Sequence, residues 1–95
     1  MKSYFVYILK CSDGSYYTGI TNDLDRRVAE HNEGNDTNAF VYKRRPVKLV
    51  WYTSYGDVRN AIALEKKLKG WNKRKKEALI RGDFNALPNL SKKKF

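Results

Sequence analysis

Tyrosine, arginine and histidine side chains are grouped near the start of this chain, in two predicted strands and the helix that follows. Arg27 and His31 are four residues apart and therefore share one face of that helix. They lie beside its apolar residues, where Tyr7 and Tyr17 could also point along the sheet surface. Phenol, guanidinium and imidazole groups together suit chemistry on a phosphate. Each also has an ordinary explanation: Arg27 as a solvated arginine, and His31 as a half-buried histidine near a helix C-terminus.

Glu65 is unusual in both charge and position. It is the only acidic residue between Asp57 and Glu77, in a stretch crowded with lysine and arginine. It also falls on the apolar stripe of a predicted helix, where a carboxylate is costly unless it is paired or binds a cation. Two explanations stay open. One is a salt bridge to an arginine, and the other is a ligand for Mg²⁺, which takes one or two carboxylates with water and substrate phosphates.

The charge of the chain predicts a polyanionic partner. Lysine and arginine total 20 against 10 acidic residues, which gives a net charge of +10. Such a surplus concentrates polyanions at the surface, and nucleic acid is the expected one. The clustering of the charge argues against a role in solubility alone, and no basic amphipathic helix favours a membrane. The basic candidates for nucleic-acid contact are Lys43, Arg44, Arg45, Lys66, Lys69, Lys73 and Arg74.

Length and composition exclude several classes of protein. With 95 residues, of which 41% are hydrophobic, the chain forms one small globular domain. No apolar run reaches the roughly 18–20 residues that span a bilayer, and the N-terminus shows no secretory leader. The single cysteine excludes an internal disulfide, which fits a cytoplasmic location. One histidine and one cysteine cannot make a zinc site, and there is no Walker-type phosphate loop.

Strands and helices must position these side chains. Residues 4–11 and 16–21 are rich in Tyr, Val and Ile and flank Asp13-Gly14, a strong hairpin turn signal. A polar loop follows at 34–45, and a third strand is expected at 47–53. Three helices are predicted, each between a capping residue and a glycine. The first starts near Asp23, with Thr21 or Asn22 as its cap, and ends at Gly34. The second runs from the cap Asp57 to Gly70, and the third from the cap Asn72 to Gly82.

The order β-β-α-β-α-α predicts an α+β fold, in which a small three-stranded antiparallel sheet is flanked by helices. We expect the domain to cover residues 1–82. Residues 83–95 are expected to form a C-terminal tail that is partly packed and then frayed.

The candidate residues lie in four segments along the chain. These are Phe5-Val6-Tyr7, then Tyr17-Thr18-Gly19, then the helical segment 22–31, and then the segment around Glu65. Over roughly residues 4–80 they resemble the GIY-YIG nuclease superfamily, and within it the short stand-alone bacterial members. Phe5 departs from the first glycine of the family name, which changes how closely backbone and substrate approach.

The resemblance implies a Mg²⁺-dependent endonuclease that acts on nucleic acid, with DNA favoured over RNA and Mn²⁺ able to replace Mg²⁺. Glu65 would hold the metal. Tyr7, or otherwise Tyr17, would take a proton from water, once nearby positive charge lowers its pKa. Arg27 would stabilise charge on the phosphate. His31 would orient the tyrosine or touch the phosphate.

Further positions follow from the same resemblance. Gly19 would allow tight packing under the site and is placed with the nucleic-acid contacts, while the basic clusters would grip phosphates without reading sequence. Asn72 is the candidate for an asparagine that many family members carry beyond the glutamate. One alternative is a non-cleaving module that binds DNA or structured RNA on the same fold. Another is a domain whose activity needs a protein partner, although a monomer is favoured.

Overall fold

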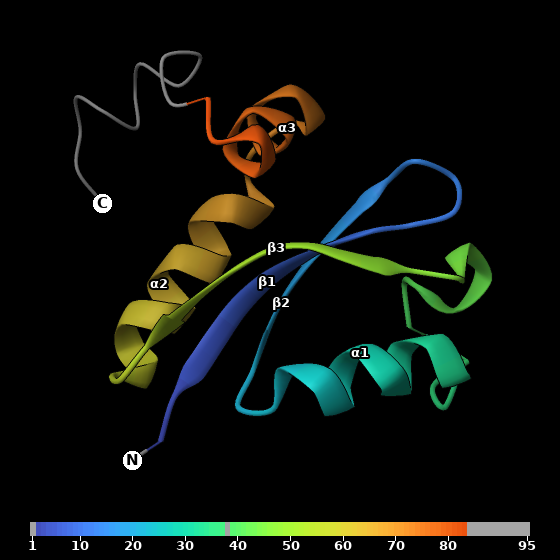
Figure 1. Ribbon diagram of the computed structural model, residues 1–95, viewed down its shortest axis with the longest axis horizontal. Coiled ribbons are helices and arrows are strands. Elements are labelled where there is room, and N and C mark those ends of the chain that lie inside the picture. The colour runs from blue at the N-terminus through green and yellow to red at the C-terminus, as the bar shows by residue number, and fades with distance from the viewer. Residues whose placement is uncertain (1, 38, 84–95) are drawn as a thin grey trace.

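The computed structural model describes residues 2–37 and 39–83. Within these ranges three strands and three α-helices occur in the order expected from the sequence, and the α+β prediction is confirmed. Their bounds are β1 Tyr4–Lys10, β2 Tyr16–Thr21, α1 Leu24–Glu33, β3 Lys48–Tyr55, α2 Val58–Lys69 and α3 Lys73–Arg81. A single-turn 3₁₀ helix, Tyr42–Arg44, lies in the loop between α1 and β3. Figure 1 shows their arrangement.

The sheet has the order β2-β1-β3, with β1 antiparallel to both neighbours (Figure 1). The register places Tyr7 of β1 between Gly19 of β2 and Tyr52 of β3. A tight turn joins β1 to β2, and Gly14 adopts a φ of 86° in it, a conformation that side chains other than hydrogen disfavour. The hairpin thereby fixes which residues of β1 and β2 share a face.

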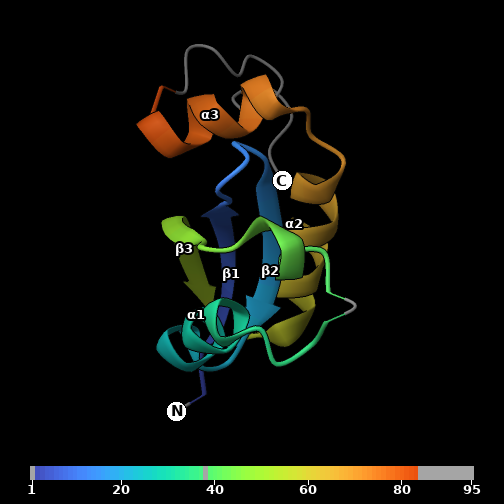
Figure 2. The same cartoon turned by 90° about the vertical axis from the view of Figure 1, so that its right-hand side faces the viewer.

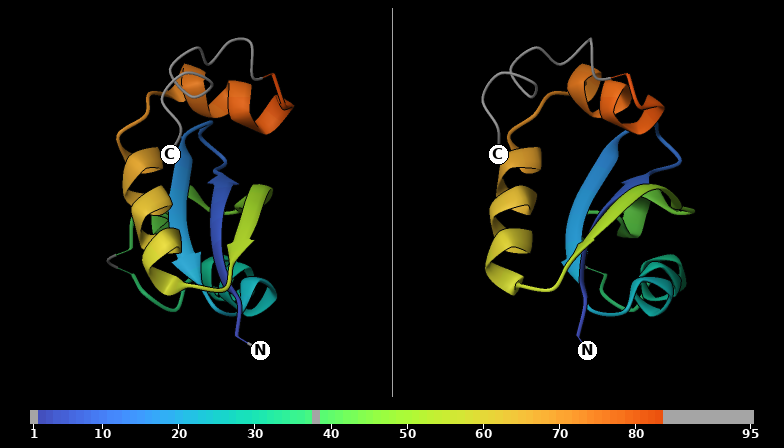
Figure 3. Two further views of the ribbon diagram at one scale, coloured as in Figure 1. Left: turned by 90° about the vertical axis from the view of Figure 1, so that its left-hand side faces the viewer. Right: turned by 60° about the vertical axis from the view of Figure 1, so that its left-hand side comes forward.

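Helices cover both faces of the sheet, as Figure 3 shows. Side chains alternate between the faces of a strand, so successive residues of β1 enter different clusters. On one face lie Val6, Ile8, Ala61, Leu68, Ala78 and Leu79, from β1, α2 and α3. On the other lie Tyr7, Leu9, Cys11, Val41 and Val47, with Leu24 and Val28 of α1 packed against them. The α1 face therefore carries the tyrosine of the first motif.

The third helix lies across the end of the sheet that holds the hairpin turn (Figure 2). Its Glu77 accepts a hydrogen bond of 3.1 Å from the hydroxyl of Tyr16 in β2. The Oδ1 of Asn72 accepts a hydrogen bond of 2.9 Å from the backbone N–H of Lys75 and so caps this helix. The predicted caps at Asp57 and Asn72 are both confirmed.

Several boundaries differ from the prediction. The first strand ends at Lys10 rather than at residue 11, and the third begins at Lys48 rather than at residue 47. The N-cap of α1 is Asp23, whose carboxylate accepts from the backbone N–H of Arg26, rather than Thr21 or Asn22. Thr21 is still part of β2, and its hydroxyl accepts from the N–H of Asp23. The third strand runs on to Tyr55, since residues 54–55 still pair with β1.

The expected tail, residues 83–95, lies outside the described residues except for Asp83, so its packing stays a prediction. In the part of the chain that the structure describes, no helix is both long and apolar enough to cross a membrane.

Candidate active site

Tyr7, Tyr17 and His31 form one cluster on the α1 face of the sheet. The Tyr7 hydroxyl is hydrogen-bonded to Nε2 of His31 at 3.0 Å. The ring of Tyr17 meets the His31 ring edge-on, with centroids 5.3 Å apart, and lies 6.3 Å from the ring of Tyr7. Antiparallel pairing of β1 with β2 places the two tyrosines on one face, and the last turn of α1 brings the imidazole onto them.

Gly19 makes this packing achievable. It lies opposite Tyr7 in the sheet, and a Cβ at this position would collide with the Tyr7 hydroxyl. The same Cβ would lie 2.5 Å from Cζ of Tyr7 and 3.0 Å from Cε2 of Tyr17. The expected tight packing is therefore present. Gly19 is itself buried, so it supports the tyrosines from beneath, and its placement among the nucleic-acid contacts stays a prediction.

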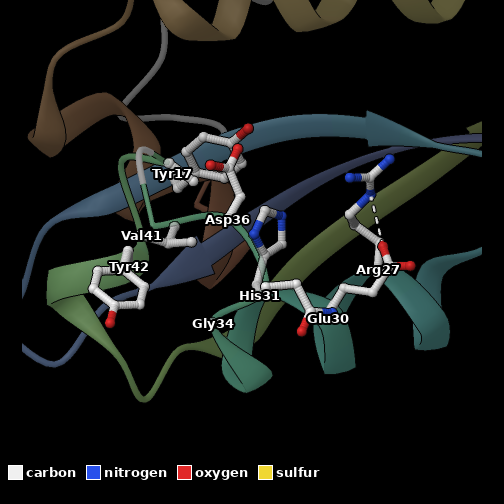
Figure 4. A pocket seen from close by; sticks show the side chains of 10 residues that line it. Tyr17, Arg27, Glu30, His31, Gly34, Asp36, Val41 and Tyr42 are labelled. Carbon is white, nitrogen blue, oxygen red and sulfur yellow. Dashed lines mark ion pairs between the residues drawn. The ribbon is translucent and has the colours of Figure 1, made fainter.

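A cavity of about 260 Å³ opens beside the cluster. Tyr17, Arg27 and His31 line it together with Glu30, and Figure 4 shows these side chains around it. Nε of Arg27 lies 3.8 Å from a carboxylate oxygen of Glu30 (dashed line in Figure 4). Sequence reasoning missed Glu30, although its spacing of three residues from Arg27 was a usable signal.

Glu65 lies on α2, which packs against β1 and β2 from the face of the sheet opposite Tyr7, and it does not line the cavity. Its side chain is only 13% exposed, and one carboxylate oxygen lies 2.7 Å from Nζ of Lys69, one turn further along the helix. Of the two explanations open from sequence, the salt bridge exists, but its partner is a lysine rather than an arginine. The charge of Glu65 acts on the Tyr7 phenol, and that of Lys69 interacts with Tyr17.

The electrostatics of Tyr7 oppose one expectation. Burial raises the pKa of Tyr7 well above its ordinary value, and Tyr17, Glu65 and Glu30 raise it further, while Arg27 lowers it. Arg27 acts in the expected direction, but burial outweighs it, so the pKa of Tyr7 is raised overall. Removing the hydroxyl from water penalises the phenolate more than one guanidinium stabilises it.

The pKa of His31 shifts in the opposite direction. Burial lowers the pKa of His31, the Arg27 charge lowers it further, and Glu30 opposes both. Tyr7 thus keeps its proton and His31 is neutral at neutral pH. A protonated phenol beside a neutral imidazole can donate its O–H to Nε2.

Two arginines expected to bind nucleic acid also hold the loop before β3. Arg44 donates to the Phe40 carbonyl at 2.7 Å, pairs with Asp13 at 3.1 Å and stacks 3.9 Å from the centre of the Phe40 ring. Arg45 donates to the Tyr42 carbonyl at 2.8 Å and stacks on the Tyr42 ring. The other basic candidates, Lys43, Lys66, Lys69, Lys73 and Arg74, are exposed.

Two other positions lie away from the cavity. Phe5, which replaces the first glycine of the family name, packs edge-on against Tyr52 with ring centroids 6.1 Å apart. Asn72 uses its side chain as the α3 cap. Neither residue lines the cavity.

The donor set limits which metal would fit. Among residues 2–37 and 39–83, no three or more His, Cys, Asp or Glu side chains are grouped closely enough to hold a metal ion. A closed structural zinc site is therefore excluded for this part of the chain. A single carboxylate fits Mg²⁺, which commonly keeps several waters and completes its shell with substrate phosphates.

Comparison with known proteins identifies the family of this chain. Residues 3–78 match the GIY-YIG catalytic domain. The chain belongs to the GIY-YIG family. This confirms the resemblance noted from the sequence, and the family is one of nucleases. Tyr7, Tyr17, Arg27, His31 and Glu65 all fall within the matched residues.

Small bacterial GIY-YIG-like proteins are similar to almost the whole chain. A UPF0213 protein of Staphylococcus aureus is 43% identical over 85% of this chain and 98% of its own. The solution structure of the UPF0213 protein BH0048 from Bacillus halodurans is 35% identical, covers 97% of both chains and has a TM-score of 0.56. That of EF2693 from E. faecalis is 32% identical over 86% of both, with a TM-score of 0.61. The chain is therefore similar over most of its length to these small bacterial proteins.

Proposed function

We propose that this protein is a Mg²⁺-dependent endonuclease that hydrolyses phosphodiester bonds, with DNA favoured over RNA as substrate and Mn²⁺ able to replace Mg²⁺. The observation that carries the proposal is the cluster of Tyr7, Tyr17 and His31 beside a cavity that Arg27 also lines. The residues come from three elements and fall within the span that matches the GIY-YIG catalytic domain. Glu65 acts electrostatically on the same cluster.

Glu65 would hold the metal, since its half-buried carboxylate supplies the one protein ligand that Mg²⁺ needs when a substrate phosphate supplies others. Bound Mg²⁺ supplies Lewis-acid stabilisation of the negative charge that develops on phosphate. Arg27 would donate to a non-bridging phosphate oxygen from the cavity wall, where its guanidinium is half-exposed.

The raised pKa of Tyr7 shapes the proton transfer that we propose. A free phenolate at this buried position is costly, so Tyr7 would accept the proton of the attacking water only as it passes its own proton to Nε2 of His31. The phenol then never carries a full negative charge. Tyr17, which lines the cavity, would position the water.

Two phenylalanine variants distinguish the roles of Tyr7 and Tyr17. If the relay operates, Tyr7→Phe loses cleavage and Tyr17→Phe keeps a larger part of it. The reverse order would make Tyr17 the proton acceptor.

The central test is cleavage of labelled DNA and RNA of several structures in Mg²⁺, in Mn²⁺ and in EDTA. Glu65→Gln keeps the size of the side chain but removes its charge, so cleavage should fall by at least about 100-fold while binding persists. Glu33→Gln is the matched control, because Glu33 is exposed at the end of α1 and does not line the cavity.

The second candidate function is a non-cleaving nucleic-acid-binding module. The complete burial of Tyr7, which is 1% exposed, favours it, because a water must reach that hydroxyl for the relay to work. A wild-type protein that binds DNA or RNA but cuts none of the panel with either metal would establish this second function.

A further inference from the structure

Lys69 occupies the carboxylate that the proposed function assigns to the metal. Its ammonium lies 2.7 Å from a Glu65 oxygen, a short charge-assisted contact. The two exposures differ: the Glu65 side chain is 13% exposed, whereas that of Lys69 is 54% exposed. The carboxylate is therefore held in place, while the lysine extends over it from solvent.

The same lysine acts electrostatically on a residue of the cavity wall. The Lys69 ammonium interacts with Tyr17, which lines the cavity, although Lys69 itself does not line it. A lysine side chain is long and rotates freely, so its ammonium can leave Glu65 and extend toward Tyr17. A phosphate bound beside Tyr17 would attract it there.

A second ion pair lies at the cavity wall. Arg27 lies 3.8 Å from Glu30, as Lys69 lies close to Glu65. A cation arriving alone must displace Lys69 from Glu65, and a phosphate arriving alone must draw a cation from its carboxylate. When both arrive together, the ammonium moves to the phosphate and the carboxylate is left for the metal, so neither charge stays unpaired.

We propose that Lys69 is a positioning residue that closes Glu65 to metal until a phosphate draws its ammonium away, so that metal and nucleic acid bind cooperatively. This rests on the proposed function. Thermodynamic linkage makes the effect reciprocal: nucleic acid raises the affinity for metal by the factor by which metal raises the affinity for nucleic acid.

The competing explanation is an ordinary helix salt bridge. An ordinary helix pair with a spacing of four residues contributes little to stability. Such a pair would affect metal binding no more than any other single positive charge. Metal affinity in the absence of nucleic acid therefore separates the two explanations.

The experiment measures Mn²⁺ binding by electron paramagnetic resonance for the full chain without nucleic acid. Lys69→Met is compared with Arg59→Met, which removes one positive charge from the same helix and frees another carboxylate, that of Asp57. Lys69→Met should bind Mn²⁺ roughly 5-fold or more tightly than Arg59→Met, the lower range of typical coupling between sites. Lys69→Arg should behave like the wild type, because it keeps a cation over Glu65.

The second arm adds a DNA duplex with phosphorothioate linkages that resist cleavage. The wild type should then gain Mn²⁺ affinity, and Lys69→Met should gain much less. Equal Mn²⁺ affinities for Lys69→Met and Arg59→Met would overturn the role of Lys69 and leave the nuclease proposal standing. Absence of Mn²⁺ binding in every variant, with and without DNA, would overturn both. If Lys69→Met fails to fold, Lys69→Gln takes its place, with circular dichroism as the check.

Discussion

Replacement of Gly19 by alanine tests the packing on which the proposed site depends. The new methyl group would lie 2.5 Å from Cζ of Tyr7 and 3.0 Å from Cε2 of Tyr17, and closer still to the Tyr7 hydroxyl. Carbon atoms in contact prefer about 3.5–4.0 Å. Because Tyr7 is 1% exposed, its ring cannot swing into solvent without opening the α1 face.

The expected destabilisation is about 1–3 kcal/mol, as for other overpacked interiors. For a domain of this size, each kcal/mol lowers the melting temperature by roughly 4–8 °C. The displaced hydroxyl also leaves His31, so cleavage should fall together with stability. Urea unfolding followed by circular dichroism gives the free energy, and a labelled substrate gives the cleavage rate.

Gly56→Ala is the matched control. A Cβ at Gly56 meets nothing within 4 Å, so this substitution should be neutral or stabilise the protein by about 0.4–1 kcal/mol through the unfolded chain. In a Tyr7→Leu background, which removes the ring, Gly19→Ala should lose most of its cost. The reasoning is refuted if Gly19→Ala is as stable as Gly56→Ala, or if its cost is unchanged in the Tyr7→Leu background.

Two further predictions concern charge. Burial raises the pKa of Tyr7 above its ordinary value of 10.0. At high pH the folded protein therefore keeps a proton that the unfolded chain releases. The free energy of unfolding that this group contributes is present below pH 10 and is lost as the pH rises above it. Tyr7→Phe should flatten that loss in urea unfolding measured between about pH 8 and 11, and an unchanged slope would place the titration elsewhere. Arg27→Ala should reduce cleavage by at least about 100-fold. Arg26→Ala should not, because Arg26 pairs with the same Glu30 but does not line the cavity; equal losses would assign the effect to Glu30.

Local chemistry made much of the fold predictable. Asp57 and Asn72 precede helices as capping residues do, and no stronger candidate stands beside them. At the start of α1, Thr21, Asn22 and Asp23 can all cap. The pairing of β2 commits Thr21 to the strand, and the hydrogen bond from the N–H of Arg26 identifies Asp23 as the cap. Sequence alone therefore gave the right helix with the wrong cap.

The candidate site was predictable in its members but not in its electrostatics. The order of motifs indicates that Tyr7, Tyr17 and His31 meet, and they do. The sign of the Tyr7 pKa shift depends on how deeply the ring is buried beneath α1, which no spacing reveals. The stacking of Arg44 on Phe40 likewise depends on the path of the loop. A basic cluster in the sequence therefore does not reveal that this arginine makes a structural contact.

The charges that could attract a nucleic acid lie apart from the groups that are proposed to act on it. Arg27, at the cavity, is paired with Glu30, Lys69 is paired with Glu65, and burial favours the neutral forms of Tyr7 and His31. Other exposed cations, Lys43, Lys66, Lys73 and Arg74, lie on the loop before β3, on α2 and on α3, where they can attract a polyanion from a distance. Under the proposed function, metal and phosphate would each have to displace an ion pair, and the two together would leave neither charge unpaired. Such coupling would restrict hydrolysis to a nucleic acid already docked on the basic surface.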